Sequence, residues 1–573
     1  MVGLSLFLFW VYGHRPLVGL PWQWADDGLY LRQSEAFLRW LNGDGKQWLG
    51  PYDALILSKA PLFALWMALL HILHVPLRVA EFALLLLLPW LFRAAVRPVL
   101  ALPWWLLATT GTLLIALPSF PQEERLLRSA LQVALSSGCL VSGVGVILRA
   151  RTPNARMAPW AALTGLLFAL AYLNREETVW LLPLMLCAVA AILLHTWRNR
   201  SWLQGLLATG SLVGATAIPI ALISGLNYHS YGVFVTTTRR APEFTRAHQL
   251  LTRLEPKTRE RYVPIRAATR LKAYAVSPTF ARMRSYLEGP ETDPIARNPG
   301  HLFTSGLPLT AREFVVTNFQ FVLQEAAFQA GARTARDSEA MFRAIARELE
   351  SAIALGWISA GAKGPATLAP PLPGDYGRIV RQTAVSLRKL YALDGMVLPT
   401  GDVSSGALED LQRMENLTYE ALAPTKEMRS LDLPEVGAGA RRLAYEVITK
   451  LEMAAYALGS GVLLSFAVAT AARHRRDRAR VNLAFAGLAL CGSLAAFSFA
   501  MAVTDVLGFP LLKPTRAAYN NLGYAPLSVV GAFGLVVLFS WLRSASKGAA
   551  ATDVLVSART PAAVVAPSEP RGS

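Results

Sequence analysis

Long apolar segments recur along the chain, and they constrain its fold more than any other feature. Runs such as "EFALLLLLPWLF" and "GSGVLLSFAVATAA" belong to a sequence of 573 residues, of which 53% are hydrophobic and 16% are charged. The mean hydropathy is +0.36. A soluble protein of this size carries charge on about a quarter of its residues. The sequence therefore predicts an all-α polytopic membrane protein.

The apolar segments predict about ten membrane spans. The segment 60–75 has only 16 residues, whereas a crossing helix needs about 20, so an interfacial or re-entrant helix fits it as well as a span does. The first apolar segment is also short, which indicates a misplaced start codon or a truncated or tilted helix. The predicted spans are 2–20, 78–96, 99–118, 127–148, 157–173, 178–196, 202–225, 452–472, 481–507 and 522–542.

Arginines orient these spans. If 60–75 lies in the interface, every strongly basic short loop falls on one side of the membrane, as the positive-inside rule requires. Both termini are then cytoplasmic, and the net charge of +18 comes from the loops rather than from a nucleic-acid surface. The basic loops contain Arg93 and Arg97, Arg149, Arg151 and Arg156, Arg198 and Arg200, Arg473 to Arg480, and Arg543 and Lys547.

The same topology places the acidic clusters together on the outer side. One such cluster alone is equally compatible with acids that merely tolerate the outside. The coincidence of several clusters, some with arginine adjacent, favours a functional site at the outer membrane surface. The candidates are Asp26 and Asp27 in "WADDGLY", Glu123, Glu124, Arg125 and Arg128 in "FPQEERLLR", Arg175, Glu176 and Glu177 in "NREE", Asp505 in "TDVLGFP" and Tyr519 in "KPTRAAYNNLGY".

The first external loop, residues 21–77, has the composition of a catalytic loop beside lipid. After the acidic pair, an amphipathic helix is expected to lie on the membrane surface, with one face formed by Leu31, Ser34, Phe37, Leu38 and Leu41. Lys59 heads a second short apolar helix, and Tyr52 precedes it. A carboxylate here can act as a general base, and Lys59 with nearby arginines can hold a lipid phosphate.

Structural alternatives exist for several of these residues. Glu176 and Glu177 can simply pair with Arg175 at a helix end. Lys59 can anchor the loop at the lipid interface, and Asp505 can cap a helix. These alternatives stay open at the level of sequence.

The order of these features resembles the membrane glycosyltransferases of the GT-C fold. The resemblance consists of a first span, an outward loop with an acidic pair, an amphipathic helix and "K-x-P-L" before a short apolar helix. It is strongest to the protein O-mannosyltransferases and the lipid A aminoarabinose transferases. More narrowly, "DDGLY…WLGPYDALILSKAPLF" with "NREETVWLLP" resembles a bacterial branch of that group. It covers residues 1–225 well and the remainder more loosely.

The resemblance implies a function and roles for individual residues. It implies an inverting glycosyltransferase of the bacterial inner membrane that uses a polyprenyl-phosphate-linked sugar, with its active site facing the periplasm. Asp26 matches the catalytic base, with Asp27 beside it, and Lys59 matches the donor-phosphate lysine. Glu123 or Glu124 falls at the second acid. That acid is Glu here rather than Asp, and Lys59 is followed by Ala-Pro rather than Pro-Pro.

A large insert separates the N-terminal spans from the last three. It covers residues 226–450, is mostly helical, is larger than in the resembling families and contains no motif for a nucleotide, metal or nucleophile. The stretch 317–357 predicts two amphipathic helices, with Asp337 and Ser338 at a cap position. The predicted division is therefore 1–225, 226–450, 451–545 and a disordered cytoplasmic tail, 546–573.

Two other functions compete with the enzyme. A transporter or lipid flippase would carry ionisable residues deep within its spans, whereas here the charges gather at one surface. A non-catalytic scaffold would explain the insert but not the acids. Two close carboxylates can bind a divalent metal, but metal binding is not favoured here. No cofactor is therefore expected. The sequence identifies neither the sugar nor the external acceptor.

Overall fold

Helices form every regular element in the part of the chain that the structure describes. In this computed structural model, β pairing within the described residues is confined to isolated bridges such as Leu17 with Leu422. The predicted all-α class is therefore confirmed. The described residues are 6–7, 16–21, 26–116, 126–150, 157–258, 260–292, 313–314, 316–363, 371–394, 403–425, 438–473, 478–508 and 522–543.

Among these residues, seven helices are long and apolar enough to cross a membrane. Two further predicted spans are shorter helices, α5 (Trp104–Ile115) and α7 (Ala158–Asn174), and the first predicted span lies largely outside the described residues, so the count of ten is not confirmed. The 11-residue α3 (Leu62–Ile72) agrees with the short apolar helix expected at 60–75. The seven are α4 (Leu77–Val96), α6 (Ser129–Arg149), η1 with α8 (Glu176–Leu181 and Leu182–Asn199), α9 (Trp202–Tyr231), α19 (Ala438–Arg473), α20 (Arg478–Val503) and Leu522–Arg543.

Helix α6 forms the centre of the bundle and is buried along its whole apolar stretch. It packs against α4, α7, α8 and α20. Its sequence is rich in serine and glycine, and small residues let neighbouring helices approach closely. For example, the ring of Trp160 from α7 covers Gly145. Helix α9 is the opposite case, since most of its apolar side chains are exposed, as lipid-facing residues are.

Glycines also let the helix Leu522–Arg543 pack closely against α19, and this contact gives a test of the packing. A Cβ on Gly459 would lie 2.8 Å from the Gly531 backbone, whereas a Cβ on Gly461 would meet nothing within 4 Å. Alanine is the better helix former by about 0.5–1 kcal/mol. We therefore expect Gly461→Ala to be neutral or stabilising and Gly459→Ala to cost about 1–3 kcal/mol. Thermal unfolding of the purified protein measures both, and equal effects would contradict the close approach.

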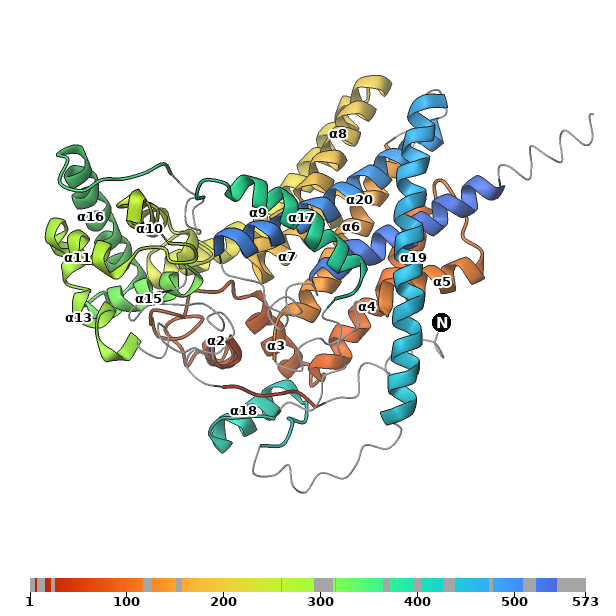
Figure 1. The fold of residues 1–573 in the computed structure, drawn as a ribbon. Coiled ribbons are helices and arrows are strands. Elements are labelled where there is room, and N and C mark those ends of the chain that lie inside the picture. Colours follow the sequence, from red (N-terminus) through yellow and green to blue (C-terminus); the bar gives the residue numbers. More distant parts are fainter. Residues whose placement is uncertain are drawn as a thin grey trace, which may run out of the picture.

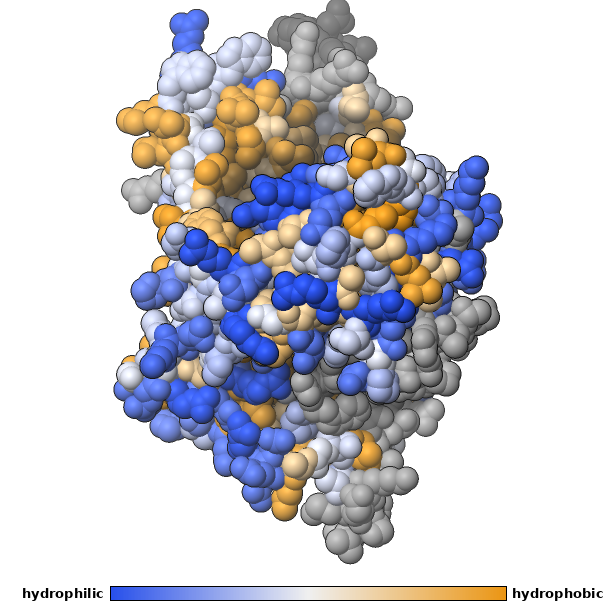
Figure 2. Space-filling model, turned by 90° about the vertical axis from the view of Figure 1, so that its left-hand side faces the viewer, coloured by the Kyte–Doolittle hydropathy of each residue, from blue (hydrophilic) through white to orange (hydrophobic). Residues whose placement is uncertain are grey.

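The first half of the insert forms a helical cap at one end of the bundle, on the left in Figure 1. We call residues 242–354 the cap. Its core contains aromatic side chains such as Phe244, Phe319 and Phe342, and its outer face is mainly hydrophilic (Figure 2). Its helices are α10 (Pro242–Thr252), α11 (Ala267–Val276), α12 (Pro278–Ala281), α13 (Arg284–Leu287), α15 (Val316–Gln329) and α16 (Ala335–Ala354).

The two predicted amphipathic helices are α15 and α16, but the predicted cap position is wrong. Thr334 is the N-cap residue of α16, because its hydroxyl accepts from the Asp337 N–H while the Asp337 carboxylate accepts from the Thr334 N–H. This reciprocal pair is a capping box. Asp337 is thus inside the helix, and Ser338 is buried one position later.

The second half of the insert returns to the bundle and to the N-terminal segment. Helix α17 (Asp375–Tyr391) packs along α20, and α18 (Leu408–Thr418) packs on α3. Residues 16–21 run beside the chain around α18, where the Leu17 N–H donates to the Ala421 carbonyl at 3.0 Å. The insert therefore touches both the spans and the first external loop, and the predicted domain boundaries stay predictions.

Candidate functional site

The two residues to which the resemblance gives the leading roles lie side by side. Asp26 begins α2 (Asp26–Leu41), where a carboxylate is favoured by the positive end of the helix dipole. Lys59 comes from the loop before α3, and its Nζ lies 3.2 Å from Asp26 Oδ2. The Lys59 side chain is 13% exposed and that of Asp26 is 35% exposed. Of the two charged groups, the carboxylate is therefore the more accessible and the ammonium the more sheltered.

Two adjacent polar side chains of α2, Gln33 and Ser34, attach the helix to the rest of the protein, and the apolar pattern did not predict these contacts. Gln33 Nε2 donates to the Ile56 carbonyl at 2.6 Å, and Ser34 Oγ donates to the Ala64 carbonyl at 2.9 Å. On the face expected to lie on the membrane, Leu41 is half exposed, whereas Leu31 and Ser34 are buried by protein. Buried polar groups need hydrogen-bond partners, so these bonds fix α2 against the loop and α3 and thereby place Asp26.

A second cluster joins η1 (Glu176–Leu181) to η2 (Thr238–Arg240) through Glu176. Its carboxylate is buried and accepts from the Arg239 guanidinium, and its other oxygen lies 4.0 Å from Arg128 Nη1. The neighbouring Arg240 donates to the Glu176 carbonyl at 3.0 Å. Arg239 also donates through Nε to the Ser58 carbonyl at 3.0 Å, and Ser58 precedes Lys59. The two clusters are therefore parts of one site.

Arg128 is positioned by a buried polar network beneath the site. Its Nη1 donates to the Asn174 carbonyl at 2.7 Å, and Asn174 Nδ2 donates to the Arg128 carbonyl at 3.0 Å and to Gln132 Oε1 at 2.9 Å. Gln132 in turn donates to Thr178 Oγ1 at 2.9 Å. These hydrogen bonds to backbone and side-chain groups hold the guanidinium in place before any substrate arrives.

An aromatic ring from the cap covers the cations. Lys59 Nζ lies 5.3 Å from the centre of the Phe321 ring, and Arg239 Cζ lies 5.5 Å from it. Cation–π contacts at these distances are favourable. Phe321 belongs to α15, so the cap contributes one wall of the site. The first external loop and the region around η1 contribute the others.

Electrostatics link the same residues. Burial lowers the pKa of the Lys59 ammonium, Asp26 opposes that shift, and Arg128 and Arg239 add to it. Tyr30 lies one helical turn after Asp26 and is fully buried, and burial raises the pKa of its phenol far above the ordinary value. Its hydroxyl therefore stays protonated, and it makes no hydrogen bond within the described part of the chain.

The other predicted site residues have different positions. Asp27 is fully buried, and Arg175 pairs with Glu177 at 3.8 Å between Nε and Oε2. Asp505 lies in η6 (Thr504–Gly508), where its backbone carbonyl accepts from the Tyr262 hydroxyl at 3.0 Å. Glu123, Glu124, Arg125 and Tyr519 lie outside the described residues.

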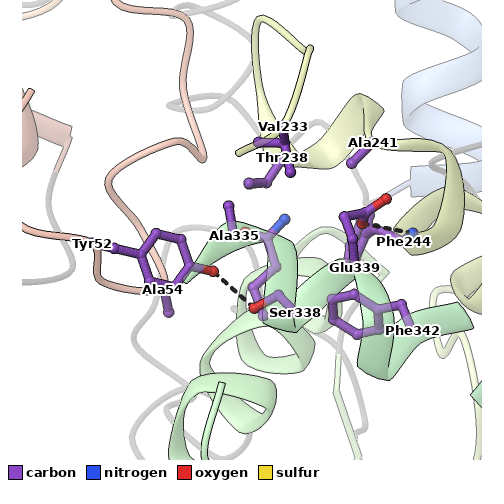
Figure 3. Close-up of a pocket in the computed structure, with 11 residues that line it drawn as sticks. Tyr52, Ala54, Val233, Thr238, Ala241, Phe244, Ala335, Ser338, Glu339 and Phe342 are labelled. Carbon is purple, nitrogen blue, oxygen red and sulfur yellow. Dashed lines mark hydrogen bonds between the residues drawn. The ribbon is translucent and has the colours of Figure 1, made fainter. Parts of the chain in front are cut away.

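Tyr52 belongs to a separate small pocket between the first loop and the cap (Figure 3). Its hydroxyl lies 2.8 Å from Ser338 Oγ at the start of α16. Phe244 and Phe342 line the apolar side of the pocket, and the Glu339 carboxylate accepts from two backbone N–H groups at the start of α10. Tyr52 thus joins the loop to the cap rather than facing Lys59.

Sequence reasoning missed the contributions of the insert. Arg239, Arg240 and Phe321 are far in sequence from Asp26, and no spacing rule connects them. One signal was available: the adjacent Arg239 and Arg240 lie in the segment after α9, on the side predicted to be external, against the positive-inside rule. Within the described residues, no three His, Cys, Asp or Glu side chains gather in a way that could hold a metal ion.

Comparisons with known proteins give a distant structural likeness. No protein-family model matches the chain, and no curated protein sequence matches it. The chain is similar to the crystal structure of ArnT from Cupriavidus metallidurans bound to undecaprenyl phosphate, with 14% identity, 93% of this chain and 76% of that chain covered, and a TM-score of 0.30. The apo structure of the same protein matches with the same identity and coverage and a TM-score of 0.27. A likeness at this level carries no argument about activity, so the proposal below rests on the residues of the site.

Proposed function

We propose that this protein is an integral-membrane glycosyltransferase that transfers a sugar from a polyprenyl-phosphate donor to an acceptor, with inversion and with Asp26 as the general base. The observation that carries the proposal is the Asp26–Lys59 pair beside the Arg128–Glu176–Arg239 cluster. In these pairs three cations face two carboxylates, and Arg240 and the Arg175–Glu177 pair lie beside them, so the group as a whole carries excess positive charge. A phosphate group would complete the charge balance, and its natural neighbours are Lys59 and the two guanidinium groups.

The proposed reaction assigns one task to each group. The acceptor's hydroxyl or amine gives its proton to the Asp26 carboxylate as its oxygen or nitrogen bonds to the anomeric carbon. The bond from that carbon to the donor phosphate oxygen breaks, and polyprenyl phosphate leaves with the electron pair. Lys59, Arg128 and Arg239 stabilise the charge that develops on the phosphate. Asp26 suits the base because its carboxylate is partly exposed, whereas Asp27 is fully buried.

The position of the charges favours an enzyme over a transporter. A transporter needs ionisable groups near the middle of its spans. Along α6, the central helix, the residues from Ser129 to Leu148 carry no charged side chain. The site instead gathers where the external loops meet the helix ends. We propose that this end faces the periplasm, and that Glu123 or Glu124 supplies a second acid.

Lys59→Gln tests the phosphate-binding role. Removing one preorganised donor of this kind costs about 100-fold to 1,000-fold in rate, so we expect kcat/KM for the donor to fall by about 100-fold. The assay follows release of polyprenyl phosphate from a labelled polyprenyl-phosphate sugar by purified protein in detergent, with a cell-envelope extract as acceptor. In detergent there are no two membrane sides between which a transporter could move a substrate, so a transporter releases no polyprenyl phosphate in this assay. If the wild-type protein releases none, the proposal is overturned.

The matched control is Lys46→Gln, which removes the same charge from an exposed position in the same loop and should leave the rate unchanged. Because burial lowers the Lys59 pKa, the wild-type rate should fall with rising pH at a lower pH than an ordinary lysine allows. Lys59→Arg keeps the charge at all accessible pH values, so its rate should not show that fall. If Lys59→Arg had the same pH profile as the wild type, the Lys59 ammonium would not be the group whose loss of charge lowers the rate.

A further inference from the structure

Helix α17 lies against the spans and has two unlike faces. Its Ile379 packs with Ala502 at the end of α20 and with Val506 and Leu507 of η6. Leu390 is buried in the core of the bundle, and the Tyr391 hydroxyl is hydrogen-bonded to Ser460 of α19. Figure 1 shows α17 crossing in front of α20 and running toward α19. The helix is therefore attached along membrane-spanning helices rather than to the body of the cap.

The apolar side of α17 extends beyond what the protein covers. Tyr376 and Val380 are each 72% exposed, and they are four residues apart, so they form one stripe beside Ile379. A stripe of large apolar side chains next to spanning helices faces the acyl region of a bilayer when the protein is in its membrane.

The opposite side of α17 is basic. Helical spacing places Arg381 and Arg388 about 200° from Ile379 and Leu390, and Arg378 at the edge of the same face. All three arginines are exposed. None of them forms an ion pair with any residue that the structure describes, whereas exposed arginines of the cap do, such as Arg246 with Glu350. Among the described residues, their charges therefore have no acidic partner.

We propose that α17 is an interfacial helix that binds the headgroups of anionic phospholipids. Tyr376 and Val380 enter the boundary of the acyl chains, and Arg378, Arg381 and Arg388 contact lipid phosphates. Anionic headgroups complement the unpaired arginines, and the apolar stripe continues from membrane-spanning helices, which a soluble partner would not match. This inference does not depend on the proposed enzymatic activity.

Lipid binding at α17 also bears on the cap. Asp375, the first residue of α17, accepts from Arg261 at 2.6 Å. Tyr262, the residue after Arg261, donates through its hydroxyl to the Asp505 carbonyl in η6. A helix fixed on the bilayer surface would thus restrict the motion of the segment that leads into α11. It would thereby also stabilise the position of the cap on the bundle.

The test compares the full-length protein in nanodiscs of phosphatidylcholine alone and of an equal mixture with phosphatidylglycerol. Each arginine near an anionic surface contributes about a factor of five in affinity. We therefore expect the anionic mixture to slow hydrogen exchange of the α17 amides by about tenfold or more. The difference should disappear in the variant R378Q/R381Q/R388Q. High salt should also abolish it in the wild type, since salt screens exposed charges.

The control variant R284Q/R336Q/R347Q removes three exposed arginines from the cap and should behave like the wild type. The salt experiment keeps the test valid if the triple variant fails to fold. Equal exchange in both nanodiscs for the wild type would overturn the proposal. Slowing by a trace of polyprenyl phosphate but not by phosphatidylglycerol would also overturn it, and would show that α17 belongs to a donor-lipid site.

Discussion

Asp26→Asn should lower the rate of sugar transfer by about 1,000-fold, within the range that loss of a general base produces. The amide keeps the size of the side chain but cannot accept the acceptor's proton. It also removes a negative charge 3.2 Å from Lys59, so donor affinity should be kept or should rise. Polyprenyl-phosphate release measures turnover, and retention of labelled donor measures binding.

The combination of lost turnover and kept binding separates a base from a structural acid. Asp44→Asn is the control, since Asp44 is an exposed carboxylate in the same external loop, and its rate should equal that of the wild type. Unchanged transfer by the Asp26 variant would remove this residue from the mechanism. A parallel loss of binding and turnover would indicate that Asp26 only positions Lys59.

Glu176→Gln should have the largest effect on stability. The carboxylate is shared by Arg239 and Arg128, and its removal leaves two sheltered guanidinium groups without that charge. Breaking a buried ion pair from one side costs about 3–5 kcal/mol. We expect a clear fall in the thermal unfolding temperature of the purified protein, together with loss of transfer.

The neighbouring Glu177 provides the matched control. Its side chain is 46% exposed and its ion pair with Arg175 is 3.8 Å long. Arg128 and Arg239 also attract this carboxylate, but its exposure to solvent weakens these interactions, so Glu177→Gln should cost less than Glu176→Gln. The double variant Glu176→Gln/Arg239→Gln should lose less than the two single losses added together, because each single change already breaks the pair. Equal destabilisation by Glu176→Gln and Glu177→Gln would show that Glu176 is not a buried charge partner.

The sequence predicted the parts of the molecule that depend on local pattern. Apolar length identified the long helices, because a spanning helix must bury every backbone polar group within itself. Length left the segment 60–75 open, and the distribution of the arginines separated it from the spans. The resemblance assigned Asp26 and Lys59, two residues of one loop, to the same site, and the structure places their charged atoms 3.2 Å apart. These inferences needed only neighbouring residues.

Features formed by distant residues could not be predicted in this way. Arg239 reaches Glu176 across 63 residues, and the Phe321 ring that covers Lys59 comes from the cap. The attachment of α2 through Gln33 and Ser34 depends on partners such as the Ile56 carbonyl, which no periodicity reveals. Even the start of α16 required the reciprocal bonds of Thr334 and Asp337, since several residues nearby suit a cap equally well.

The pairing of residues 16–21 with the chain around α18 has a consequence for assembly in the cell. The Gly19 N–H donates to Ser404 Oγ, a contact between residues 385 positions apart, and Arg413 of α18 pairs with Glu35 of α2. A ribosome adds roughly 5–20 residues each second. The segment that carries Asp26 is therefore made roughly 20–80 s before the segment that secures it. During that interval the loop that carries Asp26 lacks its contacts with the α18 region, so these contacts are among the last to form.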